Sequence, residues 1–235
     1  MTSGLLIPTL RPNSDFARDM LCPWNPGTKL SRAELEDSFS VGLNIAVGHH
    51  TKRGKYVEEQ TVPGHSIVQV WTQALSTHMG FSTSSGHQTL LDVTNVARTT
   101  LATGTNGTMI YRTDGGVNAV DKGIVCGTGT GAVAQTDYAL GTLINAGNGA
   151  GQLAYAAQGT NAISSSGTSR LITLTRAVTN NSGGAINVTE VGLYCYIQDS
   201  GNNQRTHMLC RDLLSFTVGI GATKTVTYTI TVALT

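Results

Sequence analysis

Charged side chains are scarce in this sequence. They make up 12% of its 235 residues, with 15 Lys and Arg against 14 Asp and Glu, for a formal net charge of +1. This is about half of the usual share. The chain therefore lacks the basic excess that marks a nucleic-acid-binding protein, and we expect no nucleic-acid partner. Low charge also weakens repulsion between copies, which favours self-assembly.

Long apolar runs are also missing, and the first twenty residues show no cationic start followed by an apolar stretch. We therefore expect no membrane partner, no secretion signal and synthesis in a cytoplasm. The four cysteines, Cys22, Cys126, Cys195 and Cys210, show no Cys-x-x-Cys spacing. Because disulfides follow the redox compartment, we expect reduced thiols and no metal framework.

Proline is nearly confined to the start of the chain, where four of the five occur: Pro8, Pro12, Pro23 and Pro26. Residues 1–63 read as an extended, polar N-terminal arm. Within it, the capping-box pattern Ser31-Arg-Ala-Glu34, with apolar residues at every fourth position up to Leu43, predicts one short helix over 32–46. We expect the arm to contact neighbouring subunits.

After Pro63-Gly64, apolar residues recur at intervals of three and four: Val68, Trp71, Leu75 and Met79. This spacing predicts an amphipathic entry helix over about 66–79, with Trp71 in the core, at the start of a second domain, 64–235.

From residue 89 onward, short apolar runs alternate with glycine, asparagine and threonine. Even spacing of this kind predicts a mainly β fold, a β-sandwich of jelly-roll type. The expected strands are Thr89–Val93, Thr108–Arg112, Gly123–Cys126, Leu153–Ala157, Leu171–Val178, Ile186–Ile197, His207–Arg211, Leu214–Ile220 and Thr223–Leu234.

In the last expected strand, apolar and polar residues alternate most strictly. Val226, Tyr228, Ile230 and Val232 should be buried, while threonines occupy the positions between them. In the strand over 186–197 the apolar phase changes near Glu190, which predicts a β-bulge or a corner between sheets. The turn that follows, near Gly201–Asn203, would place Cys195 opposite Cys210 if the hairpin had no register slip.

No motif predicts a catalytic, cofactor-binding or metal-binding residue. The segment Gly127–Ala132 fits a dinucleotide pattern, but it lacks the helix and the later acid that such a site needs, so a tight glycine loop is favoured. Glu190 is read as a buried structural acid with Arg176 as candidate partner, and a catalytic acid is the alternative.

Two further clusters of residues can each be interpreted as a metal-binding site or as a purely structural feature. His49-His50 with Lys52, Arg53 and Lys55 could bind metal or phosphate, but no ligand lies at suitable spacing, so a solvated loop or a contact between subunits is favoured. The segment Asp199–Asn203 resembles half of a calcium loop without its distal glutamate, and a hairpin turn explains it equally well.

Three stretches together resemble a group of tailed-bacteriophage virion proteins, often described as tail-fibre-like. They are 123–140, containing GIVCGTGTG and TDYAL; 147–153, GNGAGQL; and 176–193, RAVTNNSGGAINVTEVGL, with Arg211–Leu214 and the threonine-alternating last strand. The resemblance covers about residues 120–235. It implies a non-enzymatic β-sandwich without catalytic residues.

The expected function is therefore that of a multi-copy structural protein of the virion, made in the host cytoplasm and assembled into a tail, neck or capsid-decorating structure. Its partners would be other copies, other virion proteins and, at a fibre tip, a host receptor. The alternatives are a receptor- or glycan-binding module and a subunit of a cellular surface filament. A glycan site uses exposed aromatic side chains, and the sequence has only two tryptophans, Trp24 and Trp71.

Overall fold

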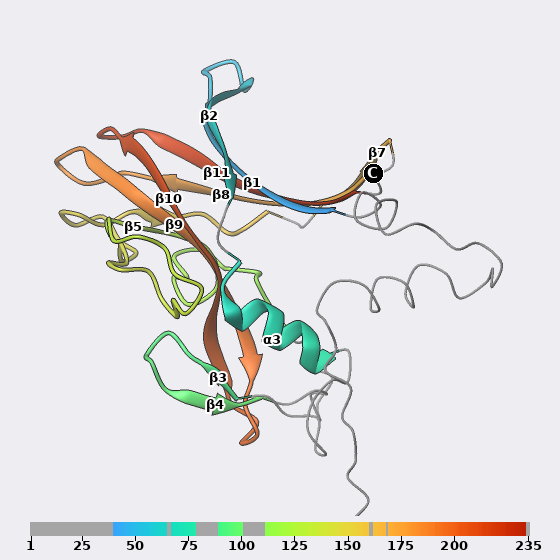
Figure 1. The fold of residues 1–235 in the computed structure, drawn as a ribbon. Coiled ribbons are helices and arrows are strands. Elements are labelled where there is room, and N and C mark those ends of the chain that lie inside the picture. The colour runs from blue at the N-terminus through green and yellow to red at the C-terminus, as the bar shows by residue number, and fades with distance from the viewer. Residues whose placement is uncertain are drawn as a thin grey trace, which may run out of the picture.

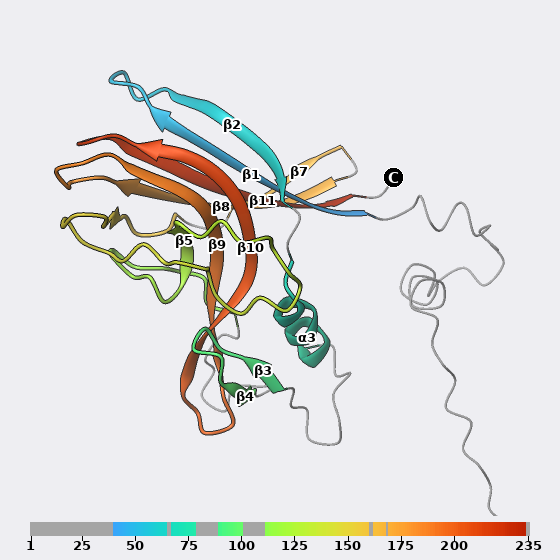
Figure 2. The same cartoon turned by 60° about the vertical axis from the view of Figure 1, so that its left-hand side comes forward.

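The chain folds into antiparallel β-sheets with one described helix, as the strand pattern predicted (Figure 1). The computed structural model describes residues 40–64, 67–78, 89–100, 111–159, 162–167 and 169–233. The larger sheet has the order β2-β1-β11-β8-β6, with β7 also paired to β8, and the smaller has the order β10-β9-β5. A third pair, β3 and β4, lies beside the helix α3 (Figures 1 and 2).

The larger sheet joins both ends of the described chain. Its strands are β1 (Ser40–His50), β2 (Tyr56–Gly64), β6 (Ala154–Tyr155), β7 (Ala162–Ser166), β8 (Ser169–Thr179) and β11 (Thr223–Ala233). The last strand, β11, is central, because it pairs with β1 on one side and with β8 on the other. The expected alternation is confirmed for Val226, Tyr228 and Ile230, which are buried, while the threonines between them are half-buried. Val232, which was also expected to be buried, is half-buried.

The helix expected over 32–46 is wrong for residues 40–46, which form most of strand β1; residues 32–39 lie outside the described part. Leu43, Ile45 and Val47 are buried in alternation and pair with β11. This two-residue period overrides the four-residue spacing that favoured a helix, because β11 covers one edge of the segment. Residues 40–64 therefore belong to the sheet rather than to an arm.

The smaller sheet consists of β5 (Gly123–Gly127), β9 (Ile186–Gln198) and β10 (Gln204–Val218). The two strands expected over 207–211 and 214–220 are thus one strand. Its register shifts between Leu213 and Phe216, opposite the stretch from Val188 to Glu190. The register shift falls where the phase change near Glu190 predicted a bulge or a corner, but its extra residue lies in β10 rather than in β9.

The hairpin of β9 and β10 forms as expected, but its register differs. Cys195 lies opposite His207, and Cys210 lies opposite Leu193. The turn is centred on Gly201, closer to β9 than expected, and a second register shift falls between Met208 and Cys210. Cys126, Cys195 and Cys210 are free and buried.

The expected entry helix is confirmed as α3 (Gln69–His78), and Trp71 packs against the core. The short strands β3 (Thr89–Leu91) and β4 (Ala97–Thr99) form a hairpin, while Arg112 makes only an isolated bridge to Tyr196. Residues 108–110 of the expected strand 108–112 lie outside the described part. Within that part, no helix is long and apolar enough to cross a membrane.

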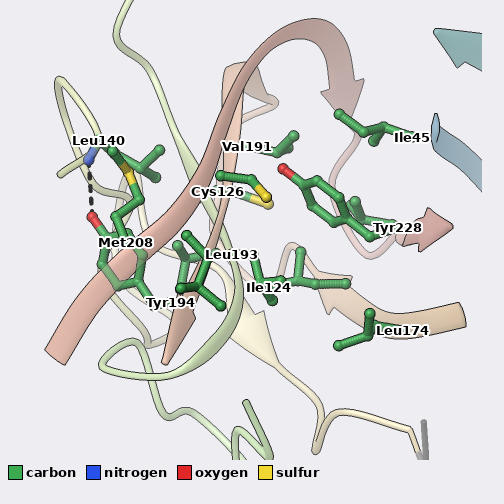
Figure 3. Close-up of a cluster of buried hydrophobic side chains, with 14 of the residues drawn as sticks. Ile45, Ile124, Cys126, Leu140, Leu174, Val191, Leu193, Tyr194, Met208 and Tyr228 are labelled. Atoms are coloured by element: carbon green, nitrogen blue, oxygen red, sulfur yellow. Dashed lines mark hydrogen bonds between the residues drawn. The ribbon is translucent and has the colours of Figure 1, made fainter. Parts of the chain in front are cut away.

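The core lies between the two main sheets (Figure 3). Ile45 and Tyr228 approach it from the larger sheet, and Ile124, Cys126 and Val191 from the smaller. Full burial of each large apolar side chain contributes about 1.5–3 kcal/mol. This arrangement is consistent with a β-sandwich, while the jelly-roll connection pattern stays a prediction.

Candidate functional site

Glu190 is fully buried on β9, and its carboxylate is surrounded by donors. The backbone amides of Gly129 and Thr142 donate to Oε1, each at 2.8 Å. The amide of Gly141 and the Nε of Arg211 donate to Oε2, at 3.1 and 2.8 Å. Burial alone would raise the pKa of Glu190, but these hydrogen bonds outweigh burial and lower it. Glu190 is therefore a buried anion held by four donors.

Arg211, not the expected Arg176, is the partner of Glu190. Arg211 also donates to Asp137 Oδ2 at 2.8 Å and to the carbonyl of Gly131 at 3.0 Å. The glycine loop after β5 thus wraps around this ion pair. A Cβ atom on Gly129 would lie 2.4 Å from Glu190 Oε1, so only glycine allows this approach. The interpretation of 127–132 as a tight structural loop is confirmed.

Arg176 forms a second buried cluster that the sequence reasoning did not assign. Arg176 is 1% exposed, and its guanidinium donates to five backbone carbonyls, with its central carbon 4.9 Å from the centroid of the Tyr155 ring. The acceptors are Gly116 and Ala119 at 2.7 Å, Ala156 and Ile124 at 2.9 Å, and Lys122 at 3.3 Å. The signal was present, because Arg176 falls in phase with the inward residues Leu174 and Val178.

Two aspartates close turns. Asp199 Oδ1 accepts from the amides of Gly201 and Asn203, both at 2.9 Å, and Oδ2 accepts from Arg205 at 2.8 Å. The hairpin-turn interpretation of 199–203 is therefore confirmed. Asp92 does the same at the β3–β4 turn, where it accepts from Thr94 and Arg98. Burial would raise the pKa of Asp92, but these hydrogen bonds lower it to about 2. Among the described residues, no cluster of three or more metal-ligating side chains occurs.

The basic segment after β1 forms the tip of the β1–β2 hairpin. The Thr51 amide donates to the Lys55 carbonyl at 2.8 Å, and Gly54 adopts a φ of 77°, so the turn is well built. His50 Nδ1 lies 3.2 Å from the Gly54 carbonyl oxygen. The tip projects clear of the two sheets in Figure 1. The loop interpretation is confirmed for Lys52, Arg53 and Lys55, whereas His49 and His50 are the last two residues of strand β1.

No protein-family model, curated protein sequence or solved structure matches this chain.

An apolar groove of about 610 Å³ opens between the end of β2, the loop at 132–135 and β10. Its lining includes Val62, Pro63, Ile67, Val133 and Leu213, and Leu213 is 44% exposed. The buried charges of Glu190, Arg211 and Arg176 point into the fold, whereas this groove and the hairpin tip face outward.

Proposed function

We propose that this chain is a structural protein of a tailed-bacteriophage virion, present in many copies and assembled into a tail, neck or capsid-decorating structure. The observation that carries the proposal is that buried charged side chains hold loops against the sheets; such a side chain is called a clamp. Glu190 with Arg211, and Arg176 alone, tie long loops to the sheets through hydrogen bonds. Such clamps make a rigid body, which suits a mechanical role better than a mobile one.

The outer face of the larger sheet supports the same proposal. Thr227 lies opposite Thr175, and Thr229 opposite Thr173, so neutral hydroxyl side chains line neighbouring strands. Such a face repels another copy little and forms strands well. The low overall charge and the resemblance of residues 120–235 to virion proteins point in the same direction.

The test is to purify virions of the encoding phage by density gradient and to quantify the chain by mass spectrometry. Gold-labelled antibodies then place it on the particle. We expect a fixed, multiple copy number at one location. Absence from purified particles would overturn the proposal. Binding to the host surface, combined with a monomeric mass in light scattering, would support the receptor-binding alternative instead.

A further inference from the structure

Three of the four edges of the two main sheets are covered or guarded against further pairing. A neighbouring segment bonds to the edge of β5, where the Ile144 amide donates to the Cys126 carbonyl at 2.9 Å. The Val68 amide donates to the Leu209 carbonyl on β10 at 3.1 Å, and β10 also contains two register shifts. Strand β2 has its own register shift and a pair of adjacent glutamates at 58–59. Bulges and charges of this kind oppose the addition of another strand.

The fourth edge runs along β6 and β7, and β7 has none of these protections. Its five residues, Ala162–Ser166, are all exposed, and within the described part of the chain they pair only with β8. No charged residue occurs between Asp137 and Arg170, so β7 and the chain on either side of it are neutral. Figures 1 and 2 show β7 at the end of the larger sheet, clear of β9 and β10. The backbone donors and acceptors on the outer side of β7 are therefore open to another strand.

An apolar row that crosses the larger sheet also ends at β7. Its members lie opposite one another in successive strands, from β1 through β11 and β8 to β7: Leu43, Ile230, Ile172 and Ile163. Leu43 and Ile230 are buried, whereas Ile172 is half-buried. Ile163 is 76% exposed. The row is thus covered at one end and bare at the sheet edge, where a further strand would shield Ile163 from water.

A second copy of this neutral strand fits the edge better than a charged partner does. In an antiparallel pair centred on Ser164, residues 162–166 of one copy meet residues 166–162 of the other, and no like charges face each other. Ile163 then lies opposite Ser165, and the two Ile163 side chains are diagonal neighbours about 7–8 Å apart. Arg170, which lies opposite Ser165 on β8, donates to Ser165 Oγ within its own copy. The surface is therefore complementary to itself.

We propose that β7 of one copy pairs with β7 of a second copy, antiparallel about Ser164, so that the two larger sheets become one continuous sheet. This inference rests on the proposed function in many copies and names one contact between them. Because both copies use the same surface, a two-fold axis relates them. Five paired residues on each side bury little surface, so the contact is weak by itself and gains strength when other contacts hold the copies together.

Disulfide crosslinking tests the pairing and its register. In full-length chains that carry Cys22→Ser, the change Ser164→Cys places two thiols opposite each other, with Cβ atoms about 4.5–5.5 Å apart. Ser166→Cys is the matched control, because this exposed serine lies on the same strand but opposite Ala162 of the other copy. On mild oxidation, S164C chains should form disulfide-linked dimers at least ten-fold faster than S166C chains. An equimolar mixture of A162C and S166C chains should form heterodimers faster than either variant forms homodimers.

Charge at Ile163 tests the same contact in a second way. In the S164C chain, I163K brings two lysines together across the two-fold axis and should slow crosslinking at least ten-fold. I163E should have the same effect alone, but a mixture of the I163K and I163E chains should recover the rate, because opposite charges then face each other. The matched control is I220K, at an isoleucine that is 66% exposed in the turn before β11, and it should crosslink like the parent S164C chain. Circular dichroism should show unchanged melting for all of these variants, because the substituted side chains are exposed.

Equal crosslinking rates of S164C and S166C would overturn the pairing, and so would an unchanged rate in I163K or no recovery in the mixture. Failure of this contact leaves the proposed function standing, because the copy number in purified virions is measured separately. Conversely, rapid S164C crosslinking of a chain that is absent from virions would overturn the proposed function and keep the contact.

Discussion

At the scale of single residues, Arg176 shows how a charge can be buried without a carboxylate beside it. Five carbonyl oxygens accept from its guanidinium, and the Tyr155 ring lies against it. Burial lowers the pKa of Arg176, and the charge is kept because arginine remains protonated over the whole accessible range. The planar arrangement of the arginine N–H donors, rather than the charge alone, allows hydrogen bonds to all of these carbonyl oxygens.

Arg176→Lys should therefore destabilise the fold by about 3–5 kcal/mol, since one ammonium cannot satisfy five spread carbonyls and buried groups lose their partners. Denaturant unfolding measures this. The matched control is Arg170→Lys on the same strand, where the side chain is exposed and the change should stay within about 0.5 kcal/mol. Equal effects of the two substitutions would contradict the clamp.

The Glu190–Arg211 pair should behave as a unit. Arg211→Met leaves a buried carboxylate without its cation and should cost about 3–5 kcal/mol. The double variant Glu190→Gln, Arg211→Met should cost less than the sum of the two single variants, because the second change removes a charge that is already unpaired. Strict additivity of the unfolding free energies would show that the two side chains do not interact.

At the scale of elements, the two faces of β11 should respond differently to truncation. Ile230 is 8% exposed and lies in the core, so Ile230→Ala should cost about 2–5 kcal/mol through lost burial and a residual cavity. Thr229 lies on the other face, half-buried, and Thr229→Ala should cost under about 1 kcal/mol. Equal shifts of the denaturant midpoint would mean that both faces are buried.

The β3–β4 hairpin should lose stability in acid. The folded-state pKa of Asp92 is about 2, below the roughly 3.9 of an unfolded aspartate, so its carboxylate stabilises the hairpin above about pH 4. This stabilisation is lost as the pH falls from about 4 towards 2. Amide exchange at Val96, which donates to Asp92 Oδ1 at 3.0 Å, should accelerate over this range. Asp92→Asn should remove that pH step; a step that persists would assign it to another group.

The elements also show what a local pattern can predict. Helix α3, strand β11 and the irregularity near Glu190 follow from spacings within a few residues, and all three are present. Strand β1 was missed because a capping box precedes it and a four-residue spacing overlaps its start, while its pairing partner lies at the other end of the sequence. Likewise, the burial of Glu190 was foreseen, but its partner was not, since bulges in β10 decide which side chain meets it.

At the scale of the whole molecule, the reactivity of the three described cysteines measures whether the folded core is intact. Burial raises the pKa of Cys126 to about 12 and raises the pKa values of Cys195 and Cys210 as well. All three thiols lie in the core between the sheets. Both the low thiolate fraction and the lack of access suppress their reactivity.

In a Cys22→Ser chain, labelling of the native protein by a thiol reagent should therefore follow global unfolding. The rate should rise with denaturant in parallel with the fraction unfolded by circular dichroism. Full reaction in urea gives the control value of three thiols per chain. Rapid labelling of one thiol without denaturant would reveal a local opening of the core instead.

The central place of β11 in the larger sheet also has a consequence for synthesis on the ribosome. Strand β1 emerges early, yet its partner β11 follows every other described strand. Until that segment leaves the exit tunnel, the β1–β2 hairpin has no sheet to join, and pairing over such a sequence distance is slow. Translation products that stop before Thr223 lack β11, so the larger sheet stays incomplete and strands β1 and β8 have an unpaired edge. Only chains that include β11 hold the β1–β2 hairpin on a complete sheet.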